Sequence, residues 1–276
     1  MYGWLEASGR FRHYLRLMAD LVSSLLLSAF VVSVVLALGI YAILPARARN
    51  KRLDGHGGIM LGRNIMEVAY RMFDPLVRLL VALRVTPNMV TAFSLAPAFA
   101  SALLIATGHF GTGALLAASS GFCDMVDGML ARKYNSMSDL GELFDAAVDR
   151  YVEFLLLAGL AINFRSSPVG LILCLAAVLG SFMVSYATAK AEALGIEPPK
   201  GAMRRAERAV YVIFGCTMAP LWELVVPGDR SYAGIAYGRE LPIEVALLVV
   251  ATVANASAVR RMLRTADLIR AKRTAG

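Results

Sequence analysis

Cysteine and histidine are scarce in this chain of 276 residues, which contains three of each. The cysteines lie in apolar stretches without CxxC spacing, which indicates packing residues and gives no sign of a disulfide framework. The histidines lie outside the acidic stretch described below, so neither a histidine base nor a zinc site is expected there. The sequence also lacks internal repeats, which argues against a transporter built from two related halves.

Charged residues are scarce as well, at 17%, whereas 58% of the residues are hydrophobic and the mean hydropathy is +0.62. This composition is typical of membrane proteins and excludes an ordinary soluble domain. The net charge of +8 is compatible with nucleic-acid binding, but the basic residues flank apolar segments and do not alternate with aromatic residues. We therefore expect membrane lipids with anionic headgroups as partners, and no nucleic acid.

Apolar segments of bilayer length recur along the chain. The first, 21–44, has 24 residues without a charge. It is longer than the apolar region of a signal peptide (about 7–15 residues), so it is predicted to be an uncleaved transmembrane helix. Further spans are predicted at 91–107, from 113 through the first aspartates, and at 139–163, 169–189, 210–226 and 243–259. The predicted fold class is an all-α, polytopic membrane helical bundle with seven spans.

A basic amphipathic helix is predicted at 59–83, before the second span. Its apolar residues recur at helical spacing, and arginines decorate the other side. Such a helix lies in the membrane interface, with Pro75 expected to kink it, and the alternative is a helix that packs in a soluble domain. The chain is accordingly divided into 1–58, the first span with a basic loop, and 59–276, the main membrane domain.

Four aspartates recur at helical spacing in the stretch 124–149, which has the pattern D-x2-DG-x2-AR-x8-G-x3-D-x3-D. Asp124 and Asp127 share one helix face, and Asp145 and Asp149 share a face of the next helix. Two helices joined by a polar turn would direct all four carboxylates to one point, where they would repel one another. Two Mg²⁺ or Mn²⁺ ions, which prefer carboxylate oxygens, would remove this repulsion. The alternative is a solvated acidic helix pair, which the apolar flanks disfavour.

This stretch resembles the signature of the CDP-alcohol phosphotransferases, also called CDP-alcohol phosphatidyltransferases, which are membrane enzymes of phospholipid synthesis. Eight defining positions match, namely Asp124, Asp127, Gly128, Ala131, Arg132, Gly141, Asp145 and Asp149. The resemblance implies a six-helix core, here preceded by one additional helix, and a homodimer. It also implies transfer of a phosphatidyl group from CDP-diacylglycerol to a polar alcohol, with release of CMP. A transporter and a non-catalytic scaffold are the alternatives of another class.

The resemblance also implies roles for these residues. Asp124, Asp127, Asp145 and Asp149 would hold two ions, Mg²⁺ or Mn²⁺, and Asp149 would be the catalytic base that takes the proton of the acceptor hydroxyl. The residues expected to border the cytidine nucleotide are Asp124, Gly128, Ala131, Arg132 and Gly141.

A basic segment after residue 185 resembles that of the family members that use inositol phosphate, although Thr188 stands where those members have a lysine. The predicted acceptor-binding residues are Arg150, Ser185, Lys190, Arg205, Arg208 and Arg260. Arg208 lies near a predicted helix start, where the helix dipole disfavours a cation, and a bound phosphate would account for its charge. We therefore expect a phosphorylated acceptor, inositol phosphate first and glycerol phosphate second. The alternative for this cluster is ordinary anchoring charge.

Lysine and arginine are distributed unequally between the two sides of the predicted bundle. The side with the aspartate turn collects 22 of the 28 basic residues. By the positive-inside rule this side faces the cytoplasm. We expect an integral multi-pass protein of the bacterial inner membrane whose active site faces the cytoplasm.

Overall fold

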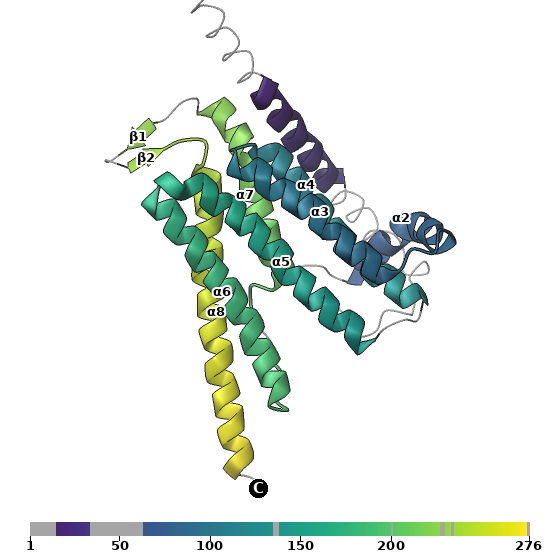
Figure 1. Ribbon diagram of the computed structural model, residues 1–276. Coiled ribbons are helices and arrows are strands. Elements are labelled where there is room, and N and C mark those ends of the chain that lie inside the picture. Colours follow the sequence, from purple (N-terminus) through teal and green to yellow (C-terminus); the bar gives the residue numbers. More distant parts are fainter. Residues whose placement is uncertain are drawn as a thin grey trace, which may run out of the picture.

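The protein is a polytopic bundle of long helices, as the sequence predicts (Figure 1). The computed structural model describes residues 15–33, 63–134, 138–199, 201–226, 230–232 and 235–274. An N-terminal helix covers Leu15–Ser33. The helices that follow are α2 (Arg63–Ala82), α3 (Pro87–Ala106), α4 (Phe110–Tyr134), α5 (Asp139–Asn163), α6 (Pro168–Ala193), α7 (Arg205–Val225) and α8 (Leu241–Thr274). The predicted boundary between 58 and 59 lies outside the described residues and stays a prediction.

Three of the helices, α3, α5 and α6, begin where the sequence offers a hydroxyl side chain to cap them. The Thr86 hydroxyl accepts a hydrogen bond from the Met89 N–H (3.4 Å) at the start of α3, and Pro87 occupies the first turn. The Ser138 hydroxyl accepts from the Gly141 N–H (3.1 Å) at the start of α5, and Ser167 does the same for α6. These caps satisfy N–H groups that have no partner within a first turn.

Among the described residues, six helices are long and apolar enough to cross a membrane, namely the N-terminal helix, α3, α4, α6, α7 and α8. The remaining predicted span, α5, is outside this set. Its first half carries the acidic residues Glu142, Asp145 and Asp149, and only its second half is apolar. It nevertheless packs within the bundle against α3 and α6.

Two packing layers meet in the core: α3, α4 and α5 form one, and α6, α7 and α8 the other, with α4 against α7 and α5 against α6. At the α3–α5 crossing, a Cβ added to Gly159 would lie 2.6 Å from the Ala102 carbonyl oxygen, so the two backbones meet closely only because this residue is glycine. Cys174 and Cys216 are buried free thiols of this core, in keeping with their predicted packing role.

The N-terminal helix begins earlier than predicted, and residues 34–44 of the predicted span lie outside the described residues. Asp20, which the predicted span excludes, lies inside the helix, because its carboxylate accepts hydrogen bonds from the Thr112 N–H (3.1 Å) and hydroxyl (2.8 Å) of α4. The Asp20 backbone also lies so close to Gly111 that no Cβ would fit there. The extra helix is thus packed onto α4 by its polar side.

Helix α2 packs against the second half of α4, which also carries Asp124 and Asp127. Val77 is buried against an apolar group that includes Val126 and Leu130. Asp74 accepts hydrogen bonds from Lys133 (2.8 Å) and from Arg78 (2.6 Å). The placement of α2 in the membrane interface stays a prediction.

The connection between α7 and α8 contains two short antiparallel strands, β1 (Arg230–Tyr232) and β2 (Ile235–Tyr237), which the sequence does not predict. They lie at the opposite end of the bundle from the start of α5, the start of α7 and the C-terminal end of α8 (Figure 1). The predicted grouping of the aspartate turn, the α6–α7 loop and the end of α8 on one side therefore agrees with the arrangement of the helices.

Candidate active site

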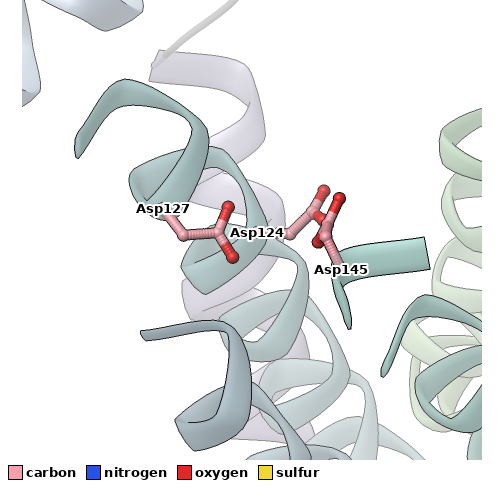
Figure 2. A group of neighbouring side chains, drawn as sticks. All are labelled: Asp124, Asp127 and Asp145. Carbon is pink, nitrogen blue, oxygen red and sulfur yellow. The ribbon is translucent and has the colours of Figure 1, made fainter. Parts of the chain in front are cut away.

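Three of the four predicted aspartates converge where α4 meets the first half of α5. Asp124, Asp127 and Asp145 each offer a carboxylate oxygen, and these oxygens lie within 4.8 Å of one another. Figure 2 shows the two side chains of α4 and the one of α5 in this group. Residues three apart on α4 share one helix face, so Asp124 and Asp127 point the same way, and Asp145 of α5 lies beside them.

The deepest of these carboxylates is held in place by α3. Asp127 is only 6% exposed, and its Oδ2 accepts a hydrogen bond from the Thr91 hydroxyl at 2.5 Å. This bond leaves the other carboxylate oxygen of Asp127 available to the cluster. Thr91 is a residue of the site that the sequence analysis did not identify, since nothing in its local pattern links it to a residue 36 positions away.

Asp149 lies beside the cluster, where the structure pairs it with an arginine. Arg205, from the first turn of α7, makes ion pairs with Asp149 and with Asp124, the latter at 3.0 Å. The guanidinium therefore bridges the two acidic helices. Arg205, a predicted acceptor-binding residue, thus lies within the acidic site itself.

The residues present fit a divalent cation. The Asp145 Oδ1 atom is buried and has no hydrogen-bond partner among the described residues. A buried carboxylate oxygen without a donor is costly, and two further carboxylates beside it increase the repulsion. A hard cation with oxygen ligands would satisfy all three groups. The geometry brings Asp124, Asp127 and Asp145 together and places Asp149 next to them, and their individual metal roles stay predictions.

Two of the predicted nucleotide-binding residues are glycines, and no side chain projects from them beside the cluster. A Cβ added to Gly128 would meet only the flexible end of the Arg132 side chain, at 3.4 Å. One added to Gly141 would meet only the Ser138 and Asn88 side chains. Ala131 is half-buried and Arg132 is exposed at the end of α4. Their contact with a nucleotide stays a prediction.

Arg208 has a partner that the sequence analysis did not anticipate. Its Nε and Nη2 atoms donate to the two carboxylate oxygens of Glu153 at 2.6 and 2.9 Å, and its Nη1 donates to the Met203 carbonyl at 2.6 Å. Arg208 is 2% exposed and Glu153 is 9% exposed. The argument that its charge requires a bound phosphate therefore loses its basis, because Glu153 supplies the counter-charge.

The other predicted acceptor-binding residues are not gathered by contacts into one cluster. Lys190 and Arg260 are exposed, and Arg150 is half-buried. The Ser185 hydroxyl donates to the Ser181 carbonyl at 3.2 Å within α6. Arg261, the neighbour of Arg260, is instead the buried residue of this pair and reaches the hydroxyl of Thr188. Sequence periodicity gives a signal for this choice, since the small residues Ala254, Ser257 and Ala258 precede Arg261 at helical spacing.

Comparison with known proteins gives a family match over most of the bundle. The family model described as CDP-alcohol phosphatidyltransferase matches residues 84–254. The chain is 31% identical over 157 residues to the archaetidylinositol phosphate synthase of Methanothermobacter thermautotrophicus, covering 55% of this chain and 79% of that protein. It is 28% identical over 208 residues to the phosphatidylinositol phosphate synthase of Mycobacteroides abscessus, and the match covers 74% of this chain and 87% of that protein.

Solved structures agree with this match. The crystal structure of Mycobacterium tuberculosis phosphatidylinositol phosphate synthase with CDP-DAG bound superposes with a TM-score of 0.60 and 26% identity, covering 71% of this chain and 94% of that chain. A second crystal structure of that enzyme, in complex with manganese and citrate, gives a TM-score of 0.59 at 26% identity, and the match covers 69% of this chain and 87% of that chain.

Proposed function

Because this chain belongs to the CDP-alcohol phosphatidyltransferase family, we propose that it transfers the phosphatidyl group of CDP-diacylglycerol to inositol phosphate and releases CMP. The observation that carries the proposal is the convergence of Asp124, Asp127 and Asp145 within 4.8 Å, with Arg205 across Asp124 and Asp149. The names of the relatives support the choice of acceptor, since both named above are inositol phosphate lipid synthases.

The reaction exchanges a phosphoanhydride bond for a phosphoester bond. The acceptor hydroxyl oxygen attacks the phosphorus that carries the diacylglycerol, a new P–O bond forms, and the pyrophosphate bond to CMP breaks. Two divalent cations held by Asp124, Asp127, Asp145 and Asp149 would neutralise the charge that develops on the bridging and leaving oxygens. The manganese complex of the Mycobacterium tuberculosis enzyme supports Mn²⁺ as one suitable ion.

The residues of the chain supply the remaining functions. The Asp149 carboxylate takes the proton of the attacking hydroxyl. Thr91 keeps Asp127 in one orientation through its 2.5 Å hydrogen bond. Gly128 and Gly141 leave room for the cytidine nucleotide, and Arg132 pairs with its phosphates by charged hydrogen bonds.

The acceptor phosphate is bound by cations around the start of α7. Arg205 is the central one, and Lys190, Arg150 and Arg260 stay the further cations predicted for this role. Arg208 contributes indirectly, because its contacts with Glu153 and Met203 fix the first turn of α7. We further propose that the enzyme is a homodimer in the bacterial inner membrane, with this end of the bundle at the cytoplasm.

The test is CMP release by purified protein from CDP-diacylglycerol with Mn²⁺, measured against inositol phosphate, glycerol phosphate, free inositol and serine in parallel. We expect inositol phosphate to give the highest kcat/KM. A preference for glycerol phosphate would change the acceptor and keep the reaction class, whereas a preference for free inositol or serine would remove the phosphate-binding role of Arg205. Absence of CMP release with any acceptor would refute the proposed function.

A further inference from the structure

The loop between α6 and α7 is held by three consecutive backbone carbonyls. The Gly201 carbonyl accepts a hydrogen bond from Arg261 Nη2 (3.2 Å), the Ala202 carbonyl from Ser257 Oγ (2.7 Å), and the Met203 carbonyl from Arg208 Nη1 (2.6 Å). Two of these donors lie on α8, more than fifty residues after the loop in the sequence. All three donor side chains are buried.

Arg261 also joins the loop to α6. It is 8% exposed, and its Nη1 donates to the Thr188 hydroxyl oxygen at 2.9 Å. That hydroxyl in turn donates to the Val184 carbonyl at 3.1 Å, so its proton is already used and its oxygen faces the arginine. Because the guanidinium group is planar, its two contacts fix the loop and α6 at a set angle to each other.

The loop is shaped to receive this arginine. A Cβ added to Gly201 would lie 2.9 Å from Arg261 Nε and 3.0 Å from Ser257 Oγ. Two residues later, Met203 has a φ of 59°, in the left-handed region that residues with a side chain rarely adopt. Such a conformation persists only where surrounding contacts enforce it. The buried Met203 side chain and its carbonyl bond to Arg208 are among these contacts.

The constrained loop leads directly into the acidic site. Arg205 follows Met203 by two residues and makes the ion pairs with Asp124 and Asp149. Its backbone therefore takes its position from the loop carbonyls that α8 holds. A shift of about 1 Å at a positioning contact is enough to lower the rate of a reaction strongly.

We propose that Arg261, assisted by Ser257, is a positioning residue of the enzyme: from α8 it holds the α6–α7 loop and thereby places Arg205 for the acceptor phosphate. Both residues lie beyond residue 254, where the match to the family model ends. The inference rests on the proposed function for its kinetic consequence, whereas its geometric part, the placement of Arg205 beside Asp124 and Asp149, does not depend on the acceptor.

The test compares Arg261→Met with Arg264→Met, which makes the same change at an exposed arginine on the same helix. We expect Arg261→Met to raise the KM for inositol phosphate about ten-fold, the size expected when a charged hydrogen bond is lost. The KM for CDP-diacylglycerol should stay within about two-fold, and Arg264→Met should change neither value. Equal increases in both KM values would indicate general damage to the fold and would overturn the proposal.

A double-variant cycle tests whether Arg261 acts through Arg205. If it does, Arg261→Met should add almost nothing to the effect of Arg205→Ala on the acceptor KM, because coupled residues are not additive. Full additivity would overturn the proposal. Ser257→Ala removes one donor and leaves the arginine, so it provides the same test, with a smaller expected effect of a few-fold, if Arg261→Met does not fold.

Titration with Mn²⁺ in the absence of substrate gives a readout that is independent of the transfer reaction. Arg205 competes with a cation for Asp124 and Asp149, so a loosened Arg205 should make Mn²⁺ bind more tightly in Arg261→Met than in the wild type. Unchanged Mn²⁺ affinity in the folded variant would refute the positioning role. If the wild type releases no CMP with any acceptor, the proposed function fails, and this titration still decides the inference.

Discussion

Carboxylates and arginines meet at both ends of this helical bundle, but they are satisfied in different ways. At the end with the N-terminal helix, Asp20 accepts two hydrogen bonds from Thr112. At the opposite end, the buried Asp145 Oδ1 has no donor among the described residues, and two more carboxylates lie within 4.8 Å. The protein itself therefore satisfies Asp20, whereas at Asp145 a carboxylate oxygen is left for a ligand, as is typical of a functional acidic residue in a membrane bundle.

The arginines differ in a similar way. Arg16 donates to the Gly108 carbonyl at the N-terminal-helix end, where it joins the extra helix to the α3–α4 turn. Burial, followed by the charge of Arg16, lowers the pKa of the neighbouring His109 below its usual value. Arg205 at the other end forms ion pairs with Asp124 and Asp149, carboxylates that are also proposed to bind the metal ions.

The largest contrast is expected between Asp127→Asn and Asp20→Ala. Loss of a ligand from a metal cluster that stabilises a phosphoryl transition state should lower CMP release about a hundred-fold or more. Asp20→Ala removes the acceptor of two hydrogen bonds, which should destabilise the protein by about 1–3 kcal/mol and leave the activity of the folded fraction unchanged. Activity and the thermal midpoint in detergent measure the two effects. If Asp127→Asn keeps its activity, the carboxylates at the acidic end are not functional in the way proposed.

The next effect concerns Arg208. Arg208→Ala should destabilise the protein by about 3–5 kcal/mol, because it leaves the buried Glu153 carboxylate without its partner. Replacing both residues, as Arg208→Met with Glu153→Leu, should recover most of the thermal midpoint. If Arg208→Ala folds as stably as the wild type and only the acceptor KM rises, then Arg208 binds the acceptor directly.

Arg205→Ala should have a smaller effect on stability and a selective effect on ligands. The acceptor KM should rise about ten-fold or more through loss of a charged hydrogen bond. Mn²⁺ affinity in the absence of substrate should increase, because the competing guanidinium is removed from Asp124 and Asp149. Weaker Mn²⁺ binding would show that Arg205 supports the metal site instead of competing with it.

The smallest effect is expected at the contact between α2 and α4. Hydrogen bonds from Lys133 and then Arg78 lower the pKa of Asp74 below its usual value. The folded-state pKa is depressed, so the contact stabilises the protein above the unfolded-state pKa and is lost as the pH falls through the folded-state pKa. Asp74→Asn should thus lower the thermal midpoint slightly at neutral pH, and the difference from the wild type should vanish in acid. A difference that persists in acid would exclude this ion pair as its cause.

The acidic site could be predicted from the sequence because its order is local. Asp124 and Asp127 lie one helical turn apart, so spacing alone places them on one face. Arg208 and Glu153 are separated by 55 residues, and Arg261 and Thr188 by 73, and no local pattern links such positions. Helical spacing after Ala254, Ser257 and Ala258 favours Arg261 over Arg260 as the inward-facing residue, but its partner Thr188 on α6 is determined by tertiary packing.

The N-terminal helix illustrates the same limit. A charge-free run gives 21–44, and this rule places Asp20 outside the span. The structure includes Asp20 because Thr112 and Gly111 of α4 supply donors and space for it. The partners that make a buried charge tolerable are distant in sequence, so hydropathy alone misplaces the start of the helix.

The most direct test of the account is the metal dependence of CMP release. Purified protein should release no CMP from CDP-diacylglycerol and inositol phosphate after exhaustive chelation. Stepwise addition of Mn²⁺ should restore the activity, with two ions bound per chain at saturation, and Asp145→Asn should need more Mn²⁺ to reach half of its maximal rate. Full activity in the presence of the chelator would contradict the assignment of these carboxylates to a metal site.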